Sequence, residues 1–175
     1  MSARETWDGA RRRTLRGLAA LLVAAALLPA ASPGAAKAES PKAETPQAKT
    51  LAIRTHKGGV VPFTVTVART QAELETGLMN RTSLAADAGM LFDFGFTQSV
   101  AMWMKDTLIP LDMLFIRADG TIAGIAARRV PESLDVIPSP GPVRAVLEIN
   151  GGAAERLGIA TGDRVEFPLF HAKAK

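Results

Sequence analysis

Short runs of alternating apolar and polar residues, separated by glycine-centred turns, fill the chain from residue 50 onward and limit it to a small set of folds. Lys57-Gly58-Gly59 and Ala118-Asp119-Gly120 each separate two such runs, which is typical of β-hairpins. The long crossover helices of parallel βαβ units are missing from the pattern. The sequence therefore predicts strands over 51–55, 60–67, 90–94, 99–104, 111–116, 121–127, 143–149 and 164–167.

Two brief helical segments interrupt these strands. Thr70 and Glu73 form a capping box that predicts a helix near residues 71–78, and a second helix over 152–157 is expected to end at Gly158. A proline-rich stretch over 131–142 predicts a long irregular excursion. The expected fold class is mainly β: a single compact, mostly antiparallel β-barrel or β-sandwich with two short helices.

The N-terminal residues have the pattern of an export signal. Four arginines between residues 11 and 16 precede an apolar run over 18–28, and a small-residue stretch ends at Ala36-Lys37-Ala38. We predict a signal peptide over 1–38 cleaved after Ala38, a disordered linker over 39–49, one β-rich domain over 50–167 and a tail over 168–175. The expected location is periplasmic or secreted, with no stable membrane span after cleavage. An uncleaved anchor is the alternative, although the run is shorter than the roughly 20 residues that span a bilayer. Sec and twin-arginine export both stay open.

Charge and composition exclude several classes of function. The formal net charge of +4 arises in the predicted signal, since 15 basic and 15 acidic residues follow residue 38. A neutral, exported domain lacks the basic surface of a nucleic-acid binder, so nucleic acid is not an expected partner. The chain has no cysteine, which excludes disulfides and thiol chemistry. We expect no cofactor and no metal, and the oligomeric state stays open.

The unusual side chains gather between Gly89 and Gly120. In an extended strand Trp103 and Lys105 share one face, while Met102 and Met104 share the other. Trp103 is either an aromatic platform for a sugar or cation, or a core residue. Clustered methionines either fill the core or bind Cu(I).

Charged residues set into apolar strands are the other candidates. Asp112 shares a face with Leu114 and Ile116, so its carboxylate needs Lys105, Arg81, Arg144 or backbone N–H groups. It is either a structural ion-pair member or a site residue. Arg81 either caps helix carbonyls or binds an anion. Glu148 lies on a strand face with Arg144 and Val146, and would act as an acid or base only beside another carboxylate.

Six motifs occur in order along the chain: Gly77-Leu78-Met79-x-Arg81, Gly89-Met90-Leu91-Phe92, Trp103-Met104-Lys105-Asp106-Thr107, Ile109-Pro110-Leu111-Asp112, Leu147-Glu148-Ile149 and Gly158-Ile159-x-x-Gly162-Asp163. Together they resemble the domain of unknown function 192 family, also called uncharacterised protein family 0127, over roughly residues 51–167. The resemblance implies a single β-rich barrel or sandwich, often secreted or membrane-attached in prokaryotes. Met102 and Asp106 stand where the family usually has Phe and Asn.

Two functions of different class follow. The first is an exported, non-catalytic module that binds a small polar ligand or a cell-envelope component, with Arg81, Trp103, Lys105, Asp106, Asp112 and Glu148 as candidate ligand-binding residues and no catalytic residue assigned. The alternative is a cell-envelope saccharide or peptide hydrolase that uses the paired carboxylates Asp112 and Glu148.

Overall fold

The structure is a computed structural model that describes residues 48–170. The predicted signal peptide, nearly all of the linker and the end of the tail lie outside the described residues. The elements are β1 (Lys49–Arg54), β2 (Val60–Ala68), α1 (Gln71–Thr76), β3 (Ala88–Gln98), β4 (Ala101–Met102), β5 (Leu111–Ile116), β6 (Ile122–Arg129), β7 (Ile137–Pro138), β8 (Val143–Asn150), α2 (Ala153–Leu157), β9 (Arg164–Glu166) and the 3-10 helix η1 (Pro168–Phe170).

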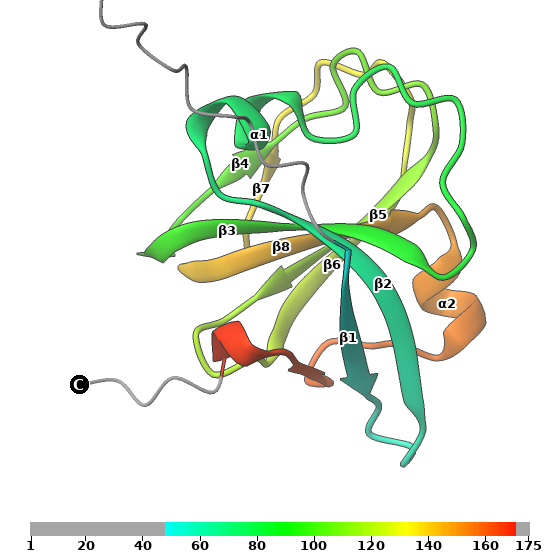
Figure 1. Ribbon diagram of the computed structural model, residues 1–175, viewed down its shortest axis with the longest axis vertical. Coiled ribbons are helices and arrows are strands. Elements are labelled where there is room, and N and C mark those ends of the chain that lie inside the picture. Colours follow the sequence, from blue (N-terminus) through cyan, green and yellow to red (C-terminus); the bar gives the residue numbers. More distant parts are fainter. Residues whose placement is uncertain (1–47, 171–175) are drawn as a thin grey trace, which may run out of the picture. The chain divides into compact units, whose positions relative to one another are not determined.

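One curled sheet organises the described residues (Figure 1). Its strand order is β6-β5-β8-β3-β2-β1-β9, and every neighbouring pair is antiparallel except β2 and β3. Hydrogen bonds tie the start of β6 to β9 at the opposite edge: Val165 N donates to Gly120 O at 2.8 Å and Ile122 N to Asp163 O at 2.9 Å. These bonds curl the sheet into a half-barrel.

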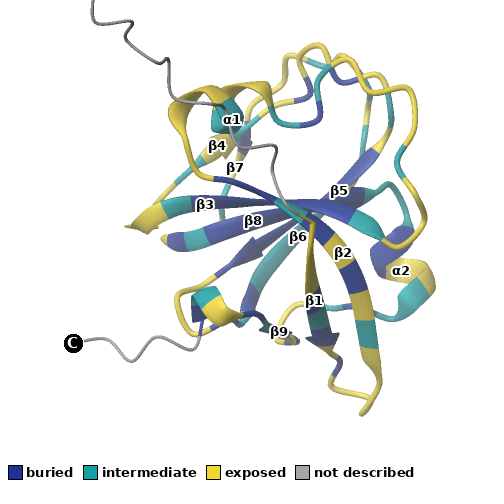
Figure 2. Ribbon diagram, in the orientation of Figure 1, coloured by how far each residue is buried: buried dark blue, intermediate teal, exposed yellow. Residues whose placement is uncertain are grey.

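Both faces of the sheet are covered where β5, β8 and β3 run (Figure 2). The inner face carries one apolar cluster, which includes Phe63, Leu114 and Leu147. The outer face carries a second cluster with Phe92 and Met113, beneath α1 and the β4–β7 pair. All six residues of β5 are buried, which explains its nearly unbroken apolar sequence.

The predicted fold class is confirmed: the chain is mainly β, with two short helices. Both hairpins form, β1–β2 and β5–β6. The capping box of α1 is present, since the Thr70 side chain accepts from Glu73 N and the Glu73 carboxylate accepts from Thr70 N at 2.9 Å. No helix among residues 48–170 is long and apolar enough to cross a membrane.

Two local expectations differ from the structure. The strand predicted over 99–104 is reduced to the two residues of β4, which pair with β7 inside the proline-rich excursion. Prolines remove backbone donors and so keep this ladder short. At the C-terminal end, Phe170 is buried in the inner cluster, so the folded part extends into the predicted tail.

Candidate functional site

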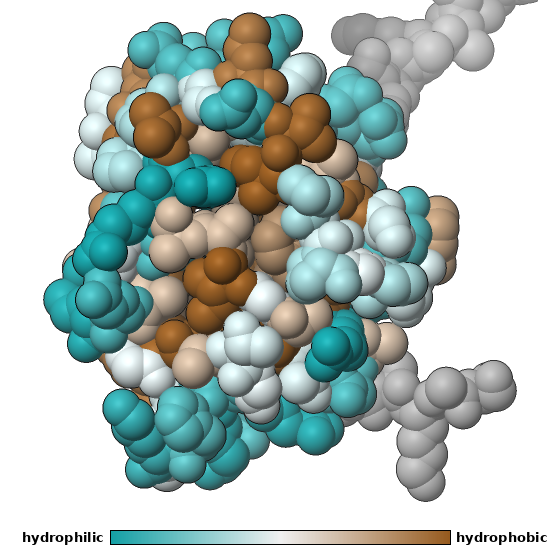
Figure 3. Space-filling view, turned by 180° about the vertical axis from the view of Figure 1, so that it is seen from behind, coloured by the Kyte–Doolittle hydropathy of each residue, from teal (hydrophilic) through white to brown (hydrophobic). Residues whose placement is uncertain are grey.

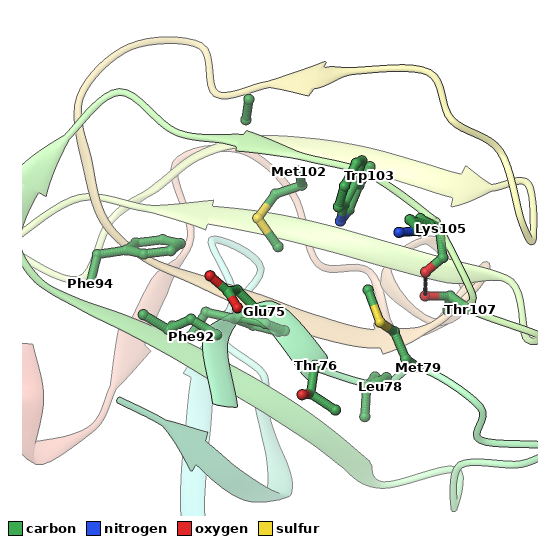
Figure 4. A pocket seen from close by; sticks show the side chains of 13 residues that line it. Glu75, Thr76, Leu78, Met79, Phe92, Phe94, Met102, Trp103, Lys105 and Thr107 are labelled. Atoms are coloured by element: carbon green, nitrogen blue, oxygen red, sulfur yellow. Dashed lines mark hydrogen bonds between the residues drawn. The ribbon is translucent and has the colours of Figure 1, made fainter. Parts of the chain in front are cut away.

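A cavity of about 130 Å³ lies between α1, β3 and β4, on the outer side of the sheet (Figure 4). Its floor is aromatic, formed by Phe92 and Phe94 of β3. Its other walls come from the turn after α1 and from the segment that begins with β4. The lining residues are Leu74, Glu75, Thr76, Gly77, Leu78, Met79, Phe92, Phe94, Ala101, Met102, Trp103, Lys105 and Thr107.

The end of α1 is seated directly on the cavity floor. Gly77 has φ +47°, and a Cβ there would lie 2.9 Å from Cζ of Phe92. Any larger residue would therefore push the helix away from β3. The absence of a side chain at this position is what lets α1 close one wall of the cavity.

Trp103 and Lys105 form the polar edge of the cavity. The alternation predicted for this segment holds, because Met102 and Met104 pack against the outer cluster while Trp103 and Lys105 are exposed. The Trp103 side chain is 50% exposed, and the Lys105 Nζ lies 5.4 Å from its ring centroid, within range of a cation–π contact. Trp103 is thus a partly open aromatic surface and not a core residue.

Two charged side chains of the described part of the chain line this cavity, and they differ in their hydrogen-bond and ion-pair partners. Glu75 accepts a hydrogen bond from Gln71 Nε2 at 2.6 Å. Lys105 forms no ion pair with any carboxylate among residues 48–170, and its contact is with the Trp103 ring. The Lys105 ammonium group therefore keeps hydrogen-bond donors that no carboxylate of the described residues occupies.

Arg81 lies in an adjoining hollow instead. That hollow has a volume of about 310 Å³ and is lined by residues of β2, α1 and β3, among them Glu73 and Met90. Thr76 and Gly77 line both spaces, so the end of α1 separates them. Arg81 and Lys105 therefore lie on opposite sides of the C-terminal end of α1, one in each space.

Asp112 is buried beneath α2, and its carboxylate accepts hydrogen bonds from backbone N–H groups. Its Oδ1 accepts from Arg128 N at 2.7 Å and from Gly152 N at 2.8 Å, and its Oδ2 accepts from Ala154 N at 2.9 Å. Of the partners considered from the sequence, backbone N–H groups are the ones found. Asp112 lies opposite Ile149 in the β5–β8 ladder, on the inner face, and so away from the Trp103 cavity.

Glu148 is buried on the outer face. It lies opposite Met90 in β3 and Met113 in β5, two members of the outer cluster. Burial raises the pKa of the Glu148 carboxyl from its ordinary value of 4.5 to about 8, because no charge or hydrogen bond from the described residues compensates the lost hydration. At neutral pH this group is therefore mostly a neutral acid.

The two carboxylates of the alternative hydrolase do not face each other. Asp112 points to the inner face and Glu148 to the outer face, since Glu148 lies opposite Met113 and Asp112 lies opposite Ile149. The sheet itself separates them. The geometry offers no support for a paired acid and base, and it brings together only Trp103 and Lys105 of the six candidates within the cavity.

Sequence reasoning missed several residues of the site. Phe92 and Phe94 are two residues apart on β3, a spacing that places both on the outer face, but their cavity depends on α1 docking over them. Away from the cavity, the buried Asp93 binds Arg69 at 3.1 Å and also Arg144, which was considered as a partner for Asp112. Only the tertiary fold sets these contacts.

Metal-ligating side chains do not cluster in the part of the chain that the structure describes, where no group of three His, Cys, Asp or Glu residues comes together. The methionines divide between two settings. Met104 and Met113 are core residues, whereas Met79 and Met102 line the cavity. Figure 4 shows both of the latter pointing into it.

The family model of the domain of unknown function 192, described as "Uncharacterized ACR", matches residues 52–167. The chain belongs to this family. Comparison with curated proteins gives no match. A solved structure from Sinorhizobium meliloti 1021, described as "a putative transcription regulator", is 48% identical with a TM-score of 0.68, over 69% of this chain and 93% of that one. A protein of unknown function from Novosphingobium aromaticivorans DSM 12444 is 40% identical with a TM-score of 0.68, over 78% of this chain and 99% of that one.

Asp106 departs from the residue that is usual in the domain of unknown function 192 family. It has φ +54°, and its carbonyl accepts from Asn80 N at 2.8 Å. Asn and Asp are the non-glycine residues that adopt this left-handed conformation most readily. Asp106 adopts this backbone conformation, which Asn would adopt equally well.

Proposed function

We propose that the chain is an exported, non-catalytic binding module that holds a small polar ligand or a cell-envelope component in the cavity beside Trp103. One observation carries the proposal: a half-exposed indole and an ammonium group without a carboxylate partner share the edge of a concave, aromatic-floored space. Binding sites combine such apolar walls with a few polar groups that orient the ligand.

The lining suggests how the ligand would be held. An apolar or planar face of the ligand packs on Trp103, and a negatively charged or carbonyl group approaches Lys105. Glu75 offers carboxylate oxygens at the same cavity. A larger ligand would extend past the end of α1 toward Arg81.

The non-catalytic character rests on the two buried carboxylates. Both carboxylate oxygens of Asp112 accept hydrogen bonds from backbone N–H groups, three in all. Glu148 lies on the face of the sheet opposite to Asp112. Neither is a lining residue of the Trp103 cavity.

Export is proposed from the order of basic, apolar and small residues before residue 39. Expression in a bacterium that has a periplasm, followed by cell fractionation and intact-mass measurement of each fraction, tests it. Glu39 is the expected first residue. Full-length protein in the membrane fraction would instead identify an anchor, and full-length protein in the cytosol would refute export.

Binding is tested by thermal shift with the full chain against amino sugars, dipeptides and small zwitterionic amines. A specific ligand raises the melting temperature by mass action. The rise should vanish in Trp103→Ala and persist in Phe96→Ala, a matched change at an exposed aromatic residue outside the cavity. A rise that survives Trp103→Ala places the ligand elsewhere.

A further inference from the structure

Exposed apolar side chains concentrate next to the cavity. Seven large hydrophobic residues are exposed among residues 48–170, and five of them lie on the two segments 103–108 and 130–136. Figure 3 shows hydrophobic residues gathered in the upper part of the view, where Figure 1 places the loops of these segments. We name these five residues the apolar rim: Trp103, Leu108, Val130, Leu134 and Val136.

Hydrogen bonds join the two segments into one surface. Met104 N donates to Ser133 O at 3.1 Å, and Glu132 N donates to Thr107 O at 3.0 Å. The β4–β7 ladder continues the contact. Trp103 belongs to both the rim and the cavity, so the rim begins at the cavity edge.

The cavity is too small for a free ligand that would also use the rim. Sites for drug-sized molecules measure about 300–1,000 Å³. A cavity of about 130 Å³ accommodates one amino-acid side chain, as an anchor residue does at the centre of a protein interface. Exposed aliphatic groups around such a pocket mark a surface that a larger partner covers.

Resting on the proposed function, we propose that the ligand is an extended polypeptide segment that inserts one apolar side chain into the cavity and covers the apolar rim with the residues beside it. Such a segment lies along β4. This strand pairs with β7 on one side, and no other strand of residues 48–170 pairs with it, so its second edge is free for β-strand addition.

The chemistry of the rim favours a polypeptide over other envelope components. Leu134, Val136 and Val130 offer no hydrogen-bonding group to sugar hydroxyls. Glu132 and Asp135 are exposed between them and repel the anionic head groups of a membrane. The buried centre of a protein interface is instead depleted of charged residues, more apolar than the rest of the surface and enriched in aromatic residues such as Trp.

The positive charge of Lys105 predicts which residue of the bound polypeptide lies next to the inserted side chain. Glu75 already binds Gln71, while Lys105 has no carboxylate partner among the described residues. An Asp or Glu next to the inserted side chain would pair with Lys105 at the cavity edge. The recognised segment therefore has an apolar anchor with an adjacent acid.

Selection of a displayed random library of peptides of about twelve residues against the full chain, with Trp103→Ala as the counter-selection, tests this inference. Enriched peptides should share an apolar residue next to an acid. Their affinity should fall about thirtyfold in Trp103→Ala, as for an interface hot spot, and about fivefold in the double variant Leu134→Ser/Val136→Ser. Lys105→Gln, which removes the positive charge, should remove most of the salt dependence of binding. Phe96→Ser, an exposed apolar residue outside the rim, should leave the affinity within about twofold.

Each other outcome overturns the inference. Failure to enrich any peptide, or enriched peptides that bind the Leu134→Ser/Val136→Ser variant as tightly as the unmodified chain, excludes a polypeptide that covers the rim. Rim-dependent sedimentation with phosphatidylcholine–phosphatidylglycerol vesicles, without peptide enrichment, identifies a membrane instead. A small molecule that binds only through Trp103 and ignores the rim leaves the proposed function standing and refutes the polypeptide. As a control, melting temperatures of the variants within about 4 °C of the unmodified chain exclude misfolding as the cause of a lost affinity.

Discussion

Replacing Glu148 by Gln should change how the stability of the protein depends on pH. Burial raises the pKa of Glu148 from 4.5 to about 8. Below pH 4.5 the carboxyl is protonated in both folded and unfolded chains. Between pH 4.5 and 8 the unfolded chain releases the proton while the folded chain keeps it, so this group favours unfolding increasingly as pH rises.

The size of the effect follows from the two pKa values. One pKa unit corresponds to about 1.4 kcal/mol, so the free energy of unfolding should fall by about 5 kcal/mol between pH 4.5 and 8. Glu148→Gln keeps the shape of the protonated acid and removes the titration. The variant should match the unmodified protein near pH 4 and exceed its free energy of unfolding by about 5 kcal/mol at pH 8.5.

Urea unfolding at a series of pH values measures the difference directly. Glu132→Gln is the matched control, because the side chain of Glu132 is exposed in the folded protein. The difference between Glu148→Gln and the unmodified protein should rise with pH, while the difference for the control should stay flat. A difference for Glu148→Gln that is equally flat would refute the account of Glu148 as an unpartnered buried acid.

Three further changes test the fold around the site. Asp112→Asn should cost about 2–4 kcal/mol in the free energy of unfolding, because the amide NH2 that replaces one carboxylate oxygen then faces at least one of the three backbone N–H groups and the charge is lost; chemical denaturation would detect it. Gly77→Ala should cost about 1–3 kcal/mol and weaken ligand binding, since its Cβ would press on Phe92; unchanged stability and affinity would contradict that contact. Trp103→Ala should shift the melting temperature by less than about 4 °C, because half of the side chain is already exposed, and calorimetry would reveal a larger loss.

The fold was predictable because local signals agreed with one another. The turns at Gly58 and Gly120, the capping box at Thr70 and the alternation of the strands each specify structure within a few residues. The parallel pairing of β2 with β3 was not predictable, because it depends on how α1 and the loop after it return the chain over the sheet, so that β3 runs beside β2 in the same direction. Pairing between distant strands leaves no short-range signal.

The candidate site was predictable in part for the same reason. The alternation of Trp103 and Lys105 against Met102 and Met104 placed the first two on one face, and the structure has them there. Asp112 looked like a site residue because a carboxylate in an apolar strand is costly. Its three backbone donors come from distant segments around β6 and α2, which no sequence pattern reveals.

The central claim is that the cavity at Trp103 binds a ligand, and the indole N–H resonance of Trp103 reports on it most directly. The chain has two tryptophans, and Trp7→Phe assigns the signals in a nitrogen-15 NMR spectrum. On addition of a compound that raises the melting temperature, the Trp103 indole resonance should shift together with the Gly77 amide, while the Gly152 and Ala154 amides beside Asp112 should not. Saturable shifts confined to Gly152 and Ala154, with Trp103 unmoved, would contradict the claim.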